Sequence, residues 1–272
     1  MLINLISIAL FASWQPYMNI VLHSSARHNP EVRFTLVTNL DENHESWKTA
    51  FGSITKPSNV VLANYTFEMI VAEIHKTNLG LGDTFLKVES PYKLIDYKPM
   101  YGVIFQKELR GLSHWGWVDL DVHLGDGKGS YECDYDNQDF VSYDHVGVHG
   151  PLMVNRNTEL VTTFYKNVLS DAYASSLAAL QGGRAILFDE LTLPHLIKHN
   201  HSVTLKNSHN RNCDFGTTRL WYKGQMQSSI GSCVIHHFGG GGPRPSRLGK
   251  EREWQRLQAF FDGGYHASDE YG

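Results

Sequence analysis

Two aspartates separated by a single residue are the strongest candidates for chemistry in this sequence. Asp119 and Asp121 flank Leu120 directly after the apolar run 115–118, and a Gly-Asp-Gly turn at 125–127 follows them. If the apolar run is a strand, side-chain alternation puts both carboxylates on one side. Mg²⁺ and Mn²⁺ prefer such oxygen ligands and commonly complete their coordination shell with substrate phosphates. The pair is therefore typical of a metal that bridges to a diphosphate.

A solvated turn is the alternative explanation for this acidic pair, because three-residue patterns of this kind often arise by chance. The pair follows an apolar strand, however, and we expect no basic partner near it. Two unpaired charges in such a place are costly unless they bind something. We therefore predict that Asp119 and Asp121 are metal ligands.

The elements that must position this pair alternate between strands and helices. Apolar runs predict strands at 3–11, 32–38, 59–63 and 115–118, and a further short strand within 146–155. Helical spacing predicts helices at 67–76, 98–109 and 159–169, and a strand-to-helix segment at 185–199. This order indicates an α/β fold with a mainly parallel, Rossmann-like sheet flanked by helices, which binds ligands at the carboxyl ends of its strands.

The composition excludes several classes of protein. Lys and Arg total 24 against 28 for Asp and Glu, so the net charge of -4 gives no basic field for binding nucleic acid. Three cysteines cannot form a disulfide framework. The apolar opening, residues 1–12, is shorter than the roughly 20 residues that span a bilayer, so we expect no transmembrane segment in this chain. The dinucleotide-binding, P-loop and hydrolase-elbow motifs are absent from the sequence.

Three segments together resemble a known family. They are Asp-Tyr-Lys-Pro-Met-Tyr-Gly at 96–102, His-Trp-Gly-Trp-Val-Asp-Leu-Asp at 114–121 and Gly-Asp at 125–126. They are similar to a family of little-characterised GT-A-type glycosyltransferases of bacteria and algae, and the resemblance extends from the first strand to about His237. It implies a GT-A fold and a hexosyltransferase-like enzyme with a nucleotide-sugar donor. It also implies a Mn²⁺ or Mg²⁺ cofactor at Asp119 and Asp121, the Asp-x-Asp position of the family.

The resemblance extends to two further sites. A histidine near the C-terminus often completes the metal site of GT-A enzymes, and the segment 234–239 resembles that element. Either His236 or His237 could serve, with His236 slightly preferred, and ordinary polar residues at a strand end are the alternative. The segment 149–153 resembles the place where a tight backbone admits the donor sugar, with Gly150 allowing the close approach. A simple turn would explain Gly150 equally well.

Four other charged residues are candidates for binding the donor or acting on the acceptor, because of their positions in the sequence. Lys98 could contact a donor phosphate as a point charge, and Asp96 could hold ribose or sugar hydroxyls. Helix capping is the alternative for Asp96. Asp189 and Glu190 end an apolar run, and sugar transfer needs a carboxylate that deprotonates or positions an acceptor hydroxyl. Capping of the following helix is the alternative for this acidic pair.

These observations predict a GT-A-like domain over residues 1–242 and a partly irregular C-terminal tail over 243–272. The expected activity is metal-dependent transfer of a sugar from a nucleoside-diphosphate-sugar donor to a hydroxyl of a glycan or another acceptor. A metal-dependent nucleotidyltransferase and a catalytically silent sugar-binding domain remain the alternatives. The compartment stays open, with the cytoplasm or, if a membrane stem belongs to a longer parent, the Golgi lumen as possibilities.

Overall fold

The computed structural model describes most of the chain up to His237. The described residues are 3–9, 22, 25–26, 29–40, 56–77, 87–120, 122–124, 137–142, 152–170, 174–182, 188–207, 212–214, 219–222, 225–228, 231–232 and 235–237. No described helix is long and apolar enough to cross a membrane.

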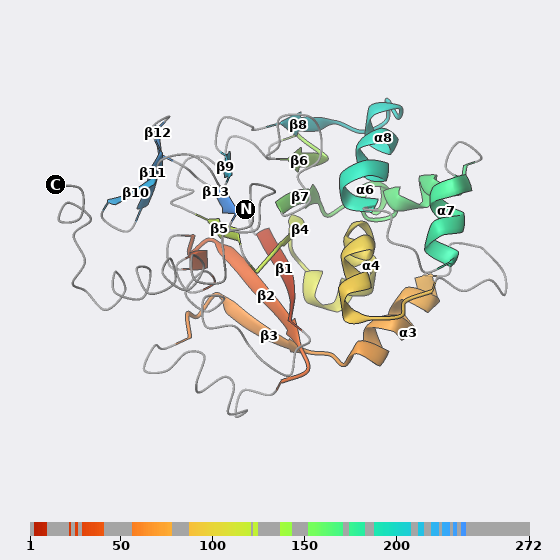
Figure 1. Ribbon diagram of the computed structural model, residues 1–272, viewed down its shortest axis with the longest axis horizontal. Coiled ribbons are helices and arrows are strands. Elements are labelled where there is room, and N and C mark those ends of the chain that lie inside the picture. Colours follow the sequence, from red (N-terminus) through yellow and green to blue (C-terminus); the bar gives the residue numbers. More distant parts are fainter. Residues whose placement is uncertain are drawn as a thin grey trace.

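A seven-stranded sheet forms the centre of the fold (Figure 1). Its strands are β1 (Ile3–Ala9), β2 (Val32–Thr38), β3 (Val60–Asn64), β4 (His114–Val118), β6 (Phe140–Ser142), β7 (Leu152–Arg156) and β8 (Leu205–Asn207), in the order β3-β2-β1-β4-β7-β6-β8. The strands β1, β2, β3 and β4 are mutually parallel, and β7 is antiparallel to both of its neighbours. The pairing of β6 with β8 is parallel. The expectation of a mainly parallel sheet is confirmed.

The helical segments pack against the sheet and are shown to one side of it in Figure 1. The α-helices are α3 (Phe67–Thr77), α4 (Tyr101–Ile104), α6 (Glu159–Thr162), α7 (Ala174–Gln181) and α8 (Leu193–Lys198). Tighter 3₁₀ segments occur at η1 (Pro91–Met100), η2 (Gln106–Leu109) and η3 (Phe164–Leu169), and η5 (Phe188–Thr192) is a π-helical turn.

Two small three-stranded sheets accompany the large one. The first has the order β5-β13-β9 and consists of β5 (Val122–Leu124), β13 (Ile235–His237) and β9 (Asn212–Asp214). The second has the order β10-β11-β12 and consists of β10 (Arg219–Tyr222), β11 (Gln225–Ser228) and β12 (Gly231–Ser232).

The large sheet is covered on both faces, so each central strand contributes to two cores. In β2, Val37 belongs to one buried cluster, whereas Phe34 and Leu36 belong to the other. The first core also contains Trp115 and Trp117 of β4 together with buried residues of α3, η1 and α4. Burial on both faces explains why these strands are nearly continuous apolar runs in the sequence.

A glycine between the two tryptophans allows β4 and β7 to approach. A Cβ atom added to Gly116 would lie 2.0 Å from the backbone oxygen of Met153. No side chain can be accommodated at that distance, so position 116 requires glycine. This close approach fixes β4, whose carboxyl end leads into Asp119.

The predicted strands at 32–38, 59–63 and 115–118 are confirmed to within one residue at each end. The predicted helix at 98–109 is wrong in its start and its continuity, because helical structure begins at Pro91 and runs through η1, α4 and η2. Buried Leu94, Tyr97 and Met100 are spaced three residues apart. That is the period of a 3₁₀ helix and not the 3.6-residue period of an α-helix.

Two other predicted segments are confirmed in part. The predicted helix at 159–169 divides into α6 and η3. In the segment 185–199, helical structure is present from Phe188 onward, and residues 183–187 lie outside the described part of the chain.

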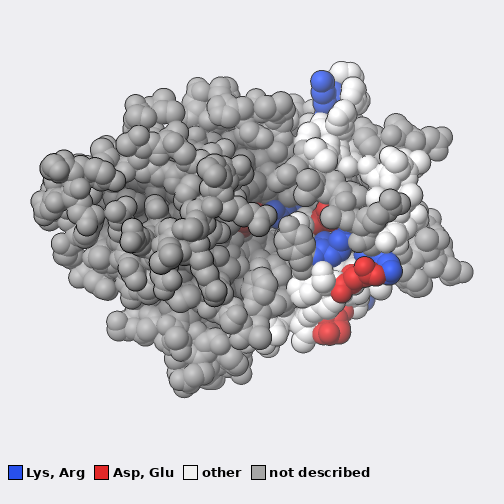
Figure 2. Space-filling view, in the orientation of Figure 1, with Lys and Arg blue, Asp and Glu red and all other residues white. Residues whose placement is uncertain are grey.

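Acidic and basic side chains intermingle over the described part of the face drawn in Figure 2. Lys76 and Glu73 form one of the exposed ion pairs among the described residues, with their charged atoms 2.6 Å apart. Such pairs on the surface contribute little to stability.

Candidate active site

The carboxyl ends of β1 and β4 lie at the point where the order of strand addition in the sheet reverses. From β1 the chain builds β2 and β3 on one side, and it then crosses to β4 on the other side of β1. Open α/β sheets bind ligands at such a switch point. The hydroxyl of Ser7 in β1 donates a 2.7 Å hydrogen bond to the carbonyl of Val118 and ties the two strand ends together. Asp119 is the next residue of the chain.

Asp119 forms an ion pair with a lysine at this point. The Nζ atom of Lys98 lies 2.8 Å from Oδ1 of Asp119. The lysine side chain is only 7% exposed, whereas the aspartate is 34% exposed. The expectation that no basic group lies near the acidic pair is therefore wrong. Lys98 is distant in sequence but packs beside β4, because η1 and α4 lie on that face of the sheet.

The turn after β4 leads directly into the small sheet that contains the C-terminal histidines. The backbone N–H of Val122 donates a 3.0 Å hydrogen bond to the carbonyl of Asp119. Strand β5 then pairs with β13 in antiparallel register, with Val122 opposite His237 and His123 opposite His236. Residues more than a hundred positions apart in the sequence are thus brought together.

A small cavity adjoins Asp119 at the same end of the sheet. It is lined by Ser7, Leu22, Ser25, Phe34, Val118, Asp119, Leu120 and Val122. The hydroxyl of Ser25 accepts a hydrogen bond from the backbone N–H of Leu124. This bond connects β5 to the segment that contains Ser25.

Five predicted site residues lie, wholly or with their side chains, outside the described part of the chain. Asp121 and Gly150 lie outside the described residues, and so do the side chains of His236, Asp189 and Glu190. Among the described residues, no group of three or more His, Cys, Asp or Glu side chains could hold a metal. The roles predicted for these five residues stay predictions.

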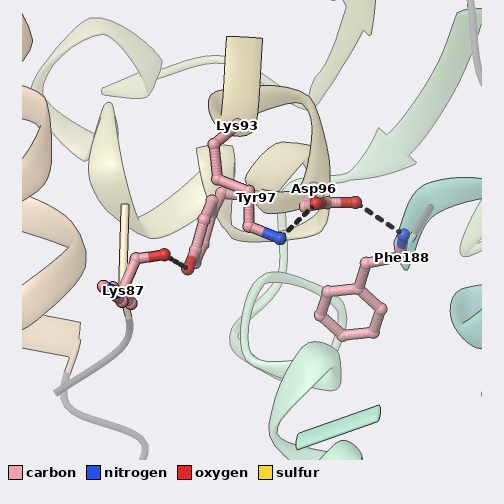
Figure 3. A network of polar contacts seen from close by, with 5 residues as sticks. All are labelled: Lys87, Lys93, Asp96, Tyr97 and Phe188. Carbon is pink, nitrogen blue, oxygen red and sulfur yellow. Dashed lines mark hydrogen bonds and ion pairs between the residues drawn. The ribbon is translucent and has the colours of Figure 1, made fainter. Parts of the chain in front are cut away.

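Asp96 is the centre of a buried polar network (Figure 3). Its side chain is fully buried, and its Oδ2 atom lies 2.6 Å from Nζ of Lys93. Its Oδ1 atom accepts a hydrogen bond of 3.4 Å from the backbone N–H of Phe188. Asp96 therefore joins η1 to the start of η5, where Asp189 and Glu190 follow in the sequence.

The capping interpretation of Asp96 is wrong, because Asp96 lies inside η1 and Ser90 occupies the N-cap. No contact in the structure tests the predicted donor contact of this residue. Lys93 was not identified by sequence reasoning. Its position three residues before Asp96 would have been a usable signal, because residues three apart align on a 3₁₀ helix.

Tyr97 shares this environment. Its side chain is completely buried, and its hydroxyl lies 3.5 Å from the carbonyl oxygen of Lys87 (Figure 3). Burial raises the pKa of the Tyr97 hydroxyl, and the negative charge of Asp96 raises this pKa further. The phenol is therefore neutral at physiological pH.

Solved structures similar to this chain are glycosyltransferases. Mouse xyloside xylosyltransferase 1 in its apo form is 15% identical, with a TM-score of 0.54, and the similarity covers 90% of this chain and 99% of that one. The galactosyltransferase LgtC in complex with donor and acceptor sugar analogs is 10% identical, with a TM-score of 0.50 and 98% of each chain covered. The predicted GT-A fold is thereby confirmed.

No curated protein matches the sequence significantly. A family model, described as "Family of unknown function (DUF6625)", matches residues 6–240. This match includes β4, the aspartate pair and β13. The chain thus has the fold of GT-A glycosyltransferases and belongs to the DUF6625 family.

Proposed function

We propose that this protein is a metal-dependent glycosyltransferase that moves a sugar from a nucleoside-diphosphate-sugar donor to a hydroxyl of a glycan or another acceptor. The surroundings of Asp119 carry the proposal. Asp119 lies at the switch point of a GT-A fold, paired with the buried Lys98, and the following strand β5 is hydrogen-bonded to the strand that contains His236 and His237.

Asp119, Asp121 and His236 would hold the metal, which we propose to be Mn²⁺ or Mg²⁺. The described part of this set fits such an ion, since the Asp119 carboxylate is one-third exposed at the sheet edge. Carboxylate oxygens and an imidazole nitrogen suit Mn²⁺. When bound, the ion would neutralise charge on the diphosphate leaving group.

The register of β5 and β13 supports His236 in preference to His237. Position 237 pairs with Val122, whose side chain is 2% exposed and belongs to the second core. Position 236 pairs with position 123, on the opposite face of the small sheet. A ligand has to lie on a face that the donor can reach, and the face shared with Val122 is packed into the core.

Lys98 and Gly150 would contact the donor. The ammonium group of Lys98 already lies at Asp119 and could attract a phosphate oxygen as a point charge. Gly150 would let the backbone approach the donor sugar closely. Both groups act by binding and orienting, so they would support transfer without entering the covalent change.

Asp189 and Glu190 would act on the acceptor. We propose that one of these carboxylates positions or deprotonates the attacking hydroxyl, while sugar transfer breaks the bond to the diphosphate. Asp96 would help to position them from the core, because it accepts a hydrogen bond of 3.4 Å from the N–H of Phe188, the residue immediately before them. This role of Asp96 supplements the predicted donor contact.

A calorimetric titration tests the proposal. The protein is titrated with UDP, GDP, CDP and ADP, each in the presence of Mn²⁺ and again with EDTA. We expect one nucleotide to bind only with the metal, and the corresponding nucleotide-sugar to be hydrolysed slowly in the absence of an acceptor. Absence of binding under both conditions would favour a catalytically silent sugar-binding domain. Release of pyrophosphate from a nucleoside triphosphate would favour a nucleotidyltransferase.

A further inference from the structure

We infer that the groove between α3 and η2 is a second ligand site of this protein, and that it binds an uncharged sugar. The groove has a volume of about 370 Å³. This volume lies within the range of roughly 300–1,000 Å³ that is typical of small-molecule sites. Helix α3 contributes Met69, Ala72, Glu73 and Lys76 to the lining, and η2 contributes Lys107 and Glu108. The two elements lie close together because η2 follows α4, which packs beside α3 (Figure 1).

The groove is separate from the cavity beside Asp119. Tyr65 lines the groove and packs in the first core. The cavity beside Asp119 is lined by residues of the second core, among them Phe34, Val118 and Val122. The two cores cover opposite faces of the large sheet. A sugar bound in the groove would therefore lie apart from that cavity, on the other face of the sheet.

The charged groups that line the groove balance one another. Glu73 and Lys76 form an ion pair with their charged atoms 2.6 Å apart. Lys107 and Glu108 add one charge of each sign. Such a groove has no net charge that would attract an anion or a cation. Hydroxyl groups suit it, because each of them can both donate and accept a hydrogen bond without carrying a charge.

Glu108 is the residue that requires a hydrogen-bond donor. Its Oε1 atom accepts a 2.9 Å hydrogen bond from the hydroxyl of Tyr65. Burial raises the pKa of the Tyr65 hydroxyl, and the hydrogen bond to Glu108 raises this pKa further, so the phenol keeps the proton that it donates. The Oε2 atom of Glu108 is buried and accepts no hydrogen bond from the described residues. A buried acceptor without a donor is unfavourable, and a ligand hydroxyl in the groove would supply the donor.

The groove also offers the apolar surface that a sugar ring needs. Met69 is 48% exposed, and Ala72 lies exposed three residues further along α3. A pyranose ring has C–H groups on its faces and hydroxyl groups at its rim. The ring could therefore pack on Met69 and Ala72, while its hydroxyl groups reach the amide of Asn64 and the charged groups of η2.

The test is an NMR titration with the methyl glycosides of glucose, galactose, mannose, xylose and N-acetylglucosamine, in EDTA and without nucleotide. We expect the wild-type protein to bind at least one of these sugars. A72W should abolish this binding, because it places a bulky side chain in the groove from an exposed position of α3. A178W makes the same change at an exposed position of α7 that does not line the groove, and it should bind as the wild type does.

E108Q tests the hydrogen bond that we assign to Glu108. Glutamine keeps an acceptor for Tyr65 but has an amide group in place of the second carboxylate oxygen. Hydrogen bonds to charged groups are stronger than those to neutral groups, so E108Q should weaken sugar binding by about tenfold.

Three results would overturn the inference. The first is a wild-type protein that binds none of the five glycosides. The second is an A72W variant with an unchanged circular dichroism spectrum that binds the sugar as tightly as A178W does. The third is an E108Q variant whose affinity for the sugar equals that of the wild type. Failure of the proposed function looks different, because it would appear in the nucleotide titrations and would leave this sugar binding unchanged.

Discussion

The buried ion pair of Lys93 and Asp96 offers the sharpest test of how this fold is held together. Their side chains are 6% and 0% exposed, and the two charged atoms are 2.6 Å apart. Replacing Asp96 by asparagine removes the negative charge that lies 2.6 Å from the buried ammonium group of Lys93. Removing one partner of a buried pair costs about 3–5 kcal/mol. The hydrogen bond to Phe188 N–H is long, at 3.4 Å, and adds little to this figure. We therefore expect D96N to lower the free energy of unfolding by about 3–5 kcal/mol.

The protein contains a matched control for this substitution. Lys76 and Glu73 are also three residues apart and also 2.6 Å apart, but their side chains are 68% and 32% exposed. Replacing Glu73 by glutamine should cost about 0.2–1 kcal/mol, because solvent screens an exposed pair. The two pairs share spacing and distance and differ in burial, so a larger loss of stability is expected for D96N than for E73Q.

Urea denaturation followed by circular dichroism and by tryptophan fluorescence measures both losses, provided that the two probes coincide. The double variant K93M/D96N should lose less than the sum of the single variants, by about 0.5–3 kcal/mol. The reasoning is refuted if D96N costs no more than E73Q, or if the losses at positions 93 and 96 simply add.

Three further predictions concern the metal ligands, the sheet and a buried phenol. D121N should abolish metal-dependent nucleotide binding in calorimetry while leaving the circular dichroism spectrum unchanged; retained affinity would exclude Asp121 as a ligand. G116A should destabilise the protein by about 3 kcal/mol or more in urea denaturation, because a Cβ would lie 2.0 Å from the Met153 oxygen. G111A, at a φ of 74° in open space, should cost only about 1–2 kcal/mol, and equal losses would contradict this account. Burial raises the pKa of Tyr97, so the folded state keeps a proton that the unfolded state releases near pH 10. The free energy of unfolding is therefore unaffected by Tyr97 below about pH 10 and falls as the pH rises further, by up to about 1.4 kcal/mol per pH unit. Y97F should reduce that slope in urea denaturation measured between about pH 9 and 11.

The parallel strands β1, β2, β3 and β4 of the central sheet could be predicted because burial on both faces makes them apolar runs of the right length. The strands β6 and β8 are only three residues long, and the sequence pattern predicts neither of them. The run 32–38 coincides with β2, and the run 115–118 differs from β4 by one residue. The sequence predicts no helical structure at 91–97, because the three-residue spacing of Leu94, Tyr97 and Met100 does not match the 3.6-residue period of an α-helix. The apolar pattern therefore defined the sheet better than the segments that cover it.

The candidate site was predictable only where it is local in the sequence. Asp119 could be placed at the end of a strand from its neighbours alone. Its pairing with Lys98 depends on the packing of η1 and α4 against β4, and no pattern in the sequence encodes that proximity. The pairing of β13 with β5 is a long-range contact of the same kind.

In chain order, all strands of the large sheet precede β13, the strand that contains the proposed metal ligand. The large sheet receives its last strand at Leu205–Asn207, whereas β13 begins at Ile235. During synthesis on the ribosome, all seven strands of that sheet emerge before the histidines that lie beside β5. A nascent or shortened chain could therefore acquire the scaffold first, and the proposed metal ligand His236 would arrive last. A chain that ended between these two strands would contain every strand of the large sheet but would lack the proposed ligand.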